Sequence, residues 1–262
     1  MSILSKLEVI VPTYRSRDLT RNFVRSFEHF SPDDIEVTFH LVENSTDTSY
    51  KQESLTWAEN VKWHNNPDAD TNKDASQNKG SWANCSAIDF VKHDLETEFV
   101  FVCHNDCFVA SSLLFEELKN KVEEGFLLIG LASSPQRNST IHSSGFLVQT
   151  KLLQEVGVTP DFSRDIDVCE ILTVHCVEED IPYFCFGGTF ADRDLYEKCN
   201  EPWKSLGPKC GVDRTLDSKN ETVIYAHLGR GSEKNFGKYF KQGKIYHSNW
   251  NSLCEELLNE QK

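Results

Sequence analysis

The sequence predicts an α/β protein in which a mostly parallel, Rossmann-like central sheet is flanked by helices. Short apolar runs rich in β-branched and aromatic residues alternate with segments whose apolar residues recur at helical spacing. The run from Phe99 to Val102 is apolar at every position, which is typical of a central strand covered on both faces. Strands that alternate with helices in this way form parallel sheets with right-handed crossovers.

The order of the elements follows from the same patterns. Strands are expected at residues 7–11, 37–42, 61–63, 99–102, 126–131, 144–148, 182–186 and 223–228. Helices are expected at residues 18–30, 80–92, 113–122, 152–156, 168–177 and 253–258. Asp18 is the expected N-cap of the first helix. The polar segment 68–79 is expected to be a loop, and residues 187–220 show no regular pattern.

Composition and charge limit the classes of function. The chain has 262 residues, of which 39% are hydrophobic and 26% charged, as in a soluble globular protein. The N-terminus lacks the apolar core of a signal peptide, and no stretch approaches the roughly 18 apolar residues of a membrane span, so a cytoplasmic protein is expected. The net charge of -14 argues against a nucleic-acid backbone as a principal partner. A phosphorylated small ligand is still compatible with this charge.

Cysteine and glycine patterns argue against further classes. The nine cysteines are an odd number without a repeated spacing, so we expect reduced and mostly buried thiols. Cys103, His104 and Cys107 lack the fourth ligand of a zinc site. No Gly-x-Gly-x-x-Gly follows the first strand and no Walker Gly-Lys-Ser/Thr occurs, which makes dinucleotide enzymes and P-loop NTPases poor candidates.

The polar triplet His104-Asn105-Asp106 directly follows the predicted central strand. In open α/β sheets, ligands bind at the carboxyl ends of such strands. The carboxylate of Asp106 is suited to hold a divalent metal on a phosphate at this place. The alternative is an ordinary strand end followed by a polar turn, and this stretch alone does not separate the two interpretations.

Several short motifs, in their order along the chain, resemble those of the family 2-type glycosyltransferases of the GT-A fold. Val9-Ile10-Val11-Pro12-Thr13-Tyr14 is similar to their first strand, and Val42-Glu43-Asn44-Ser45-Thr46-Asp47 is similar to the end of their second strand. Asn78-Lys79-Gly80 with Trp82-Ala83-Asn84 resembles the helix that leads to their metal motif. His104-Asn105-Asp106 stands where the family carries its Asp-x-Asp metal motif.

Later segments extend the likeness over residues 7–232. Residues 145–157 resemble the acceptor-side strand and helix of the family. Asp165-Ile166-Asp167 is similar to the acidic pair that follows, and Tyr225-Ala226-His227 is similar to a late histidine that closes the metal site in some members. The sequence departs from the family pattern at two positions. His104 stands in place of the first acid of the metal motif, and Arg164 stands in place of the first acid of a Glu-Asp pair.

The resemblance implies one GT-A-like domain over residues 1–262. Residues 7–110 would form its nucleotide-binding half and residues 111–232 its acceptor-side half, followed by a basic segment and a helix at 233–262. The implied activity is that of a metal-dependent glycosyltransferase, which moves a sugar from a nucleotide-diphosphate sugar to a hydroxyl acceptor, with inversion.

The resemblance also implies roles for individual residues. Asp106 and His227 would hold Mn²⁺ or Mg²⁺, and the imidazole suits Mn²⁺ better. Asp165, or as second choice Asp167, would take the proton from the acceptor hydroxyl. The donor would contact the ends of the first strands, the start of the helix that follows, and the triplet, at Pro12, Thr13, Tyr14, Glu43, Lys79, His104, Asn105 and Asp106.

Other interpretations stay open. Each candidate residue can also be a strand-end cap, a turn former, a core histidine or a helix cap. A nucleotidyltransferase-like enzyme that makes nucleotide sugars is the second hypothesis, although its Gly-rich first loop is absent from residues 12–16. A catalytically degenerate GT-A domain that only binds is the third, and the departure at His104 keeps this hypothesis open.

Overall fold

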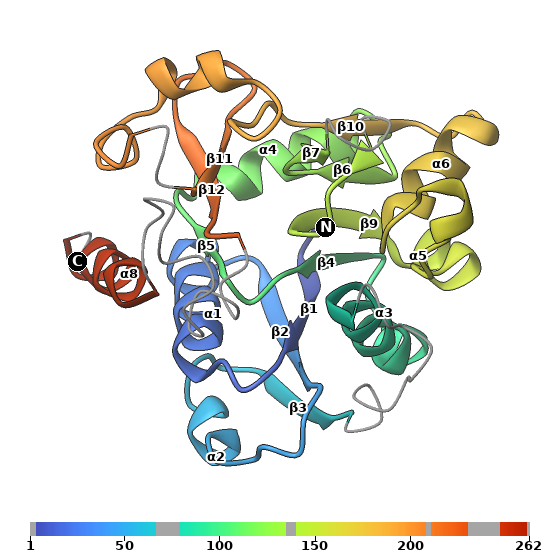
Figure 1. The fold of residues 1–262 in the computed structure, drawn as a ribbon, viewed down its shortest axis with the longest axis horizontal. Helices are drawn as coiled ribbons and strands as arrows, with labels where there is room; N and C mark the ends of the chain where they lie inside the picture. The colour runs from blue at the N-terminus through green and yellow to red at the C-terminus, as the bar shows by residue number, and fades with distance from the viewer. Residues whose placement is uncertain (1–3, 67–78, 135–139, 208–210, 230–246, 261–262) are drawn as a thin grey trace.

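A seven-stranded sheet forms the centre of the computed structural model, which describes residues 4–66, 79–134, 140–207, 211–229 and 247–260. The strand order is β10-β6-β9-β4-β1-β2-β3. Strands β4, β1, β2 and β3 run parallel, and β10 is parallel to β6. Strand β9 runs antiparallel to both of its neighbours, β4 and β6. The predicted α/β architecture with a mostly parallel central sheet is confirmed (Figure 1).

The elements have the following bounds. The strands are β1 Lys6–Thr13, β2 Glu36–Glu43, β3 Val61–Asn65, β4 Phe99–Cys103, β5 Cys107–Val109, β6 Leu128–Gly130, β7 Ser133–Ser134, β8 Thr140–Ile141, β9 Gly145–Gln149, β10 Tyr183–Cys185, β11 Asp213–Leu216 and β12 Val223–His227. The α-helices are α1 Arg17–Phe30, α2 Lys51–Ser54, α3 Lys79–Val91, α4 Leu113–Glu123, α5 Thr150–Val156, α6 Glu170–Glu178 and α8 His247–Glu260. The 3₁₀ helices are η2 Lys92–Asp94, η3 Phe162–Arg164 and η4 Arg193–Lys198.

A second, smaller sheet is antiparallel and has the strand order β11-β12-β5. Strand β5 begins directly after the triplet that follows β4, so the chain passes from the large sheet into the small sheet at this point. Figure 1 shows the small sheet beside the carboxyl end of β4. Residues 104–106 therefore lie at the junction of the two sheets.

Apolar side chains cover both faces of the large sheet, as the sequence of β4 predicts. On one face, Phe101 belongs to a cluster with Phe27 of α1 and Leu118 of α4. On the other face, Val100 and Val102 pack with apolar residues of α3, α5 and α6. Successive side chains of a strand point to opposite faces, so a single apolar run contributes to both clusters. Burial on both faces fixes the end of β4, where the polar triplet begins.

Several details differ from the sequence-based expectations. Helix α1 begins at Arg17 with Ser16 at its N-cap position, and Asp18 lies in the first turn, where it pairs with Arg17 at 2.5 Å. The segment 187–220 contains η4 and β11, which local patterns did not predict. Strand β11 has the sequence DRTL, with a single apolar residue, so it has no visible alternation. The expected loop at 68–79 lies outside the described residues except for Lys79, which begins α3.

Two further expectations concern membranes and thiols. No helix in the described part of the chain is long and apolar enough to cross a bilayer. The described cysteines are free, and all of them except Cys185 are buried.

A buried hydrogen-bonded group connects β1, β2 and the start of β4. Glu8 is 4% exposed, and its Oε1 lies 2.9 Å from Nε2 of His40. Its Oε2 accepts hydrogen bonds from the N–H groups of Glu96 and Thr97, at 2.7 and 3.0 Å. Burial acts to raise the pKa of Glu8, but the hydrogen bonds from His40 and the two N–H groups outweigh burial and lower this pKa to about 2.

We predict that Glu8→Gln lowers the free energy of unfolding at pH 7 and that the loss shrinks in acid. The pKa of Glu8 is lowered from 4.5 to about 2 by folding. A carboxylate with a depressed pKa stabilises the fold above its unfolded pKa, and this contribution disappears as the pH falls through the folded pKa. The shift corresponds to about 3 kcal/mol at pH 7 and to less than half of that at about pH 3. Urea unfolding at both pH values measures the difference.

Glu36→Gln is the matched control. Glu36 pairs with Lys6 at 2.9 Å at the start of the same two strands, but both side chains are exposed. Because solvent screens such a pair, this substitution is expected to leave stability almost unchanged at both pH values. A loss for Glu8→Gln that is the same at pH 7 and at low pH would contradict the prediction.

Candidate metal and nucleotide site

The junction triplet is held by backbone hydrogen bonds to segments that flank β9 and β12. The N–H of His104 donates to the carbonyl of Ser144 at 3.2 Å, just before β9. The carbonyl of Asp106 accepts a hydrogen bond from the N–H of Leu228 at 2.9 Å, just after β12. The triplet is thus bonded at both ends although it belongs to neither sheet, and it lies where β9 begins and β12 ends.

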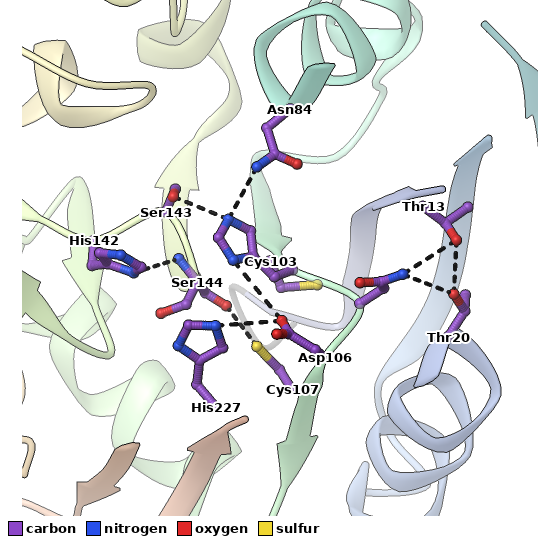
Figure 2. A network of polar contacts seen from close by, with 12 residues as sticks. Thr13, Thr20, Asn84, Cys103, Asp106, Cys107, His142, Ser143, Ser144 and His227 are labelled. Atoms are coloured by element: carbon purple, nitrogen blue, oxygen red, sulfur yellow. Dashed lines mark hydrogen bonds and ion pairs between the residues drawn. The ribbon is translucent and has the colours of Figure 1, made fainter. Parts of the chain in front are cut away.

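Asp106 and two histidines converge at this junction (Figure 2). Nε2 of His227 lies 3.3 Å from Oδ1 of Asp106, and Nδ1 of His104 lies 4.0 Å from the same oxygen. The potential ligand atoms of the three residues lie within 4.8 Å of one another. Asp106 is 4% exposed. The structure therefore brings together the two residues predicted as metal ligands and adds His104 to them.

The ring of His104 is fixed by polar contacts at its second nitrogen. Its Nε2 lies 3.0 Å from Oγ of Ser143 and 3.3 Å from Nδ2 of Asn84. Burial and the nearby His227 lower the pKa of His104 to about 4, and neighbouring carboxylates act in the opposite direction. The ring is therefore neutral at pH 7, with Nδ1 directed at Asp106. A histidine held in this way through one nitrogen is a suitable metal ligand through the other.

The donor set fits a divalent cation. Nε2 of His227 is buried and makes no hydrogen bond within the described residues, although it lies near Asp106. A buried polar atom without a hydrogen bond costs about 1–3 kcal/mol, and a cation between this nitrogen and the carboxylate would satisfy both. One carboxylate and imidazole nitrogens form a donor set that first-row divalent transition metals accept. The neighbouring thiols of Cys103 and Cys107 stay protonated, because burial raises each pKa well above its ordinary value.

A chain of polar side chains connects the triplet with the ends of β1 and β2. Nδ2 of Asn105 lies 3.3 Å from the hydroxyl oxygens of both Thr13 and Thr20. The hydroxyl of Thr13 lies 3.1 Å from that of Tyr50, which donates a short hydrogen bond to Glu43. Two predicted donor-binding residues, Thr13 and Glu43, are thereby linked to Asn105 of the triplet.

Glu43 is fully buried, and protein groups occupy its carboxylate. Besides Tyr50, the hydroxyl of Ser45 donates to it at 2.6 Å, and the N–H of Arg15 lies 3.2 and 3.3 Å from its two oxygens. These bonds hold the turn after β1, in which Arg15 has a left-handed φ of 49°. Tyr14 is 37% exposed on this turn, and the guanidinium of Arg15 lies 5.4 Å from its ring centre. Glu43 supports the turn, whereas Tyr14 is accessible at its surface.

The remaining predicted donor-binding residues are placed as follows. Pro12 is buried within β1. Lys79 is the first residue of α3, and its side chain lies outside the described part of the structure. The basic segment after Gly229, up to residue 246, also lies outside it.

The two predicted bases have different surroundings. Asp165 is exposed and follows η3 in a left-handed conformation, with φ of 56°. Asp167 is half-buried, and its charge acts on the ring of His104, whose pKa depends first on burial. Oδ1 of Asp167 accepts a hydrogen bond from the N–H of Val168 at 2.8 Å, and its own N–H donates to Glu170 at 2.7 Å. The structure thus places Asp167 within electrostatic range of the junction.

Residues 142–144 were not predicted to belong to the site. The ring centre of His142 lies 5.9 Å from that of His104 and 5.7 Å from that of His227. Nδ1 of His142 accepts a hydrogen bond from the N–H of Ser144 at 3.1 Å. Because β9 is antiparallel, its first residues lie at the edge where the parallel strands end. The sequence showed polar residues before the predicted strand at 144–148. They could be assigned to the site only once that strand was known to be antiparallel, because its start then lies at the edge where the parallel strands end.

Comparisons with known proteins extend this description. No protein-family model matches the sequence, and no curated protein matches it significantly. Solved structures do match, among them the mannosyltransferase of Pyrobaculum calidifontis, which was solved with GDP-mannose and Mn²⁺. It gives a TM-score of 0.51 at 12% sequence identity, over 68% of this chain and 54% of that chain. The chain has the GT-A fold.

A second GT-A structure is more distant in shape. The glucosyl-3-phosphoglycerate synthase of Mycobacterium tuberculosis, solved with Mn²⁺, UDP and glucosyl-3-phosphoglycerate, gives a TM-score of 0.47 at 12% identity, over 69% of each chain. The present chain spans about half of the mannosyltransferase, 54% of its length. At 12% identity the likeness to the mannosyltransferase establishes the GT-A fold and not the substrates.

Proposed function

We propose that this protein is a metal-dependent glycosyltransferase that moves a sugar from a nucleotide-diphosphate sugar to a hydroxyl acceptor. The observation that carries this proposal is the group of His104, Asp106 and His227, whose potential ligand atoms lie within 4.8 Å of one another. The group lies at the carboxyl end of the central strand, where open α/β sheets bind their ligands. The similar mannosyltransferase, which shares the GT-A fold, was solved with a nucleotide sugar and Mn²⁺.

Asp106 and His227 would hold the cation, with His104 beside them. When bound, a divalent cation supplies a Lewis acid that neutralises the charge developing on the leaving diphosphate. Asp106 offers a hard oxygen ligand, and the imidazoles offer nitrogen ligands that favour Mn²⁺ over Mg²⁺. Burial lowers the pKa of His104 to about 4, so the ring is neutral at pH 7 and one of its two nitrogens offers a lone pair to a metal.

The donor nucleotide is assigned to the edge formed by the ends of β1 and β2 and the start of α3. Tyr14, which is 37% exposed, offers an aromatic face to the base or the ribose. Pro12 and Thr13 would line the pocket, and Glu43 would shape it by holding the turn that carries Tyr14. Lys79 at the start of α3 would approach the diphosphate.

Asp167 is assigned to take the proton from the acceptor hydroxyl as that oxygen attacks the sugar. A general base must lie beside the reacting atoms, and the charge of Asp167 acts on His104 in the metal group. The N–H of Val168 donates to Oδ1 of Asp167 and so helps to orient this carboxylate. Attack opposite the leaving diphosphate gives inversion. The exposed Asp165, first choice on sequence grounds, takes second place in this proposal.

We predict that UDP-, GDP- or dTDP-sugars raise the melting temperature only when Mn²⁺ is present. Asp106→Asn removes the charge that holds the cation and is expected to weaken Mn²⁺ binding by at least about tenfold in calorimetric titration. Asp217→Asn is the matched control, because Asp217 is also buried but accepts hydrogen bonds from the N–H groups of Glu221 and Thr222, in the turn between β11 and β12. The control variant Asp217→Asn is expected to lower the stability of the protein and to keep its Mn²⁺ affinity.

The outcomes separate the candidate functions. Metal-dependent binding of a nucleotide sugar with release of the nucleoside diphosphate supports the transferase. Binding without release supports a module that binds and does not react, which the presence of His104 in place of an acid would explain. If none of the nucleotide sugars shifts the melting temperature in a metal-dependent way, the proposed function is contradicted.

We predict different effects for the two neighbouring acids. Asp167→Asn removes the proposed base and should lower the rate of Mn²⁺-dependent donor turnover by about 10²–10⁴-fold, with donor affinity kept. Asp165→Asn, two residues away on the exposed end of η3, serves as the control and should keep most of the rate. Release of the nucleoside diphosphate measures both. A larger loss for Asp165→Asn would move the base to Asp165.

A further inference from the structure

A half-buried carboxylate without a role so far, Asp213, lies in the small sheet beside His227. In the antiparallel pair β11–β12, Asp213 is directly opposite His227, and in the pair β12–β5, His227 is opposite Cys107. Directly opposed residues point to the same face of a sheet, with Cβ atoms about 4.5–5.5 Å apart. Cys107, His227 and Asp213 therefore form one row across the small sheet.

This row faces the junction. Sγ of Cys107 donates to the carbonyl of Ser144 at 3.1 Å, just before β9. Along β12, Tyr225 lies on the same face as His227, because side chains alternate, and its hydroxyl donates to the same carbonyl at 2.9 Å. Asp213 is thus on the face of the small sheet that meets the large sheet. In the strand order β11-β12-β5, His227 lies between Asp213 and β5, the strand that directly follows Asp106.

The carboxylate of Asp213 is fixed by the turn that follows β10. The hydroxyl of Thr189 donates to Oδ1 of Asp213 at 2.9 Å and accepts a hydrogen bond from the N–H of Arg214 at 2.9 Å. The N–H of Thr189 donates in turn to the carbonyl of Arg214 at 2.9 Å. A Cβ added to Gly188 would lie 3.7 Å from Oδ1 of Asp213, so the turn also packs closely on the carboxylate. These contacts hold the carboxylate in one orientation.

His227, on the neighbouring strand, is the residue whose charge acts on Asp213. Burial raises the pKa of Asp213 above its ordinary value, and the charge of His227 acts in the opposite direction. Among the described residues, His227 exerts the largest charge effect on Asp213. The side chain of Thr189 donates to this carboxylate, and the backbone N–H groups of Phe190 and Arg214 donate to it as well.

We propose that Asp213 is a positioning residue for the metal site, which orients His227 across the small sheet and strengthens it as a ligand. Nε2 of His227 faces Asp106, so Nδ1 is the nitrogen left for a second partner. Histidines that bind metals commonly donate this other N–H to a carboxylate, which fixes the tautomer and raises the basicity of the ligand nitrogen. The role of Asp213 rests on the proposed function in one respect, namely that the junction binds a divalent cation.

The first test is the affinity for Mn²⁺ alone, measured by electron paramagnetic resonance on the whole chain. Asp213→Asn is expected to weaken Mn²⁺ binding by about 10–100-fold. Asp217→Asn, at the other end of the same hairpin, is expected to keep its Mn²⁺ affinity within about twofold of the wild type. Asp217 is neither a proposed ligand nor a neighbour of one. Equal affinities for Asp213→Asn and the wild type would overturn the proposal. Loss of all detectable Mn²⁺ binding in Asp213→Asn would also overturn it, by making Asp213 a ligand.

The second test needs no metal. Long-range ¹H–¹⁵N spectra of the metal-free protein report which nitrogen of each histidine carries the proton. We expect His227 protonated at Nδ1 in the wild type and a changed tautomer ratio in Asp213→Asn, or in Thr189→Val if the first variant does not fold. An unchanged spectrum of His227 in the variant would overturn the positioning role. If the wild type binds no Mn²⁺ while the tautomer still depends on Asp213, the proposed function fails and the orienting role of Asp213 stands.

Discussion

The rest of the site depends on the passage of the chain from the large sheet to the small sheet at residues 104–106. Strand β4 ends at Cys103 and β5 begins at Cys107, so these residues leave one ladder before they enter the next. Buried backbone groups need partners, and the segments beside β9 and β12 supply them. The same hydrogen bonds bring the start of β9 and the end of β12 against the triplet. A buried carboxylate and imidazoles therefore meet at one point as a consequence of the backbone path.

The two polar networks at the junction differ in how far their hydrogen-bonding capacity is used. Toward β1 and β2 the network is closed, because Glu43 accepts hydrogen bonds from hydroxyl and N–H groups of the protein. Toward β12 it is open, because Nε2 of His227 makes no hydrogen bond in the described residues and Nδ1 of His104 is 4.0 Å from Asp106, beyond hydrogen-bond range. The closed network gives rigidity, and the open one offers ligand atoms. This difference supports the assignment of metal binding to one side and structural support to the other.

How much of the fold and of the candidate site could be predicted from the sequence depended on strand direction. The apolar run of β4 showed a central strand, and the parallel pattern placed Asp106 at the edge where ligands bind. The antiparallel direction of β9 has no local signature, so His142 at its start could not be placed beside the triplet. Asp213 was hidden because Leu216 is the single apolar residue of β11. His227 was predicted from a family resemblance, since nothing in local spacing connects it to Asp106 so far along the chain.

The most direct measurement of the central claim, that Asp106 and His227 hold a divalent cation at the end of β4, is a crystal structure with Mn²⁺ and a nucleoside diphosphate. Anomalous scattering at the manganese edge locates the ion without reference to the protein. We predict a manganese peak within bonding distance of Asp106 and His227, with the nucleotide at the edge that carries Tyr14. Nucleotide bound at that edge with no manganese at the junction, or manganese bound elsewhere, would contradict the claim.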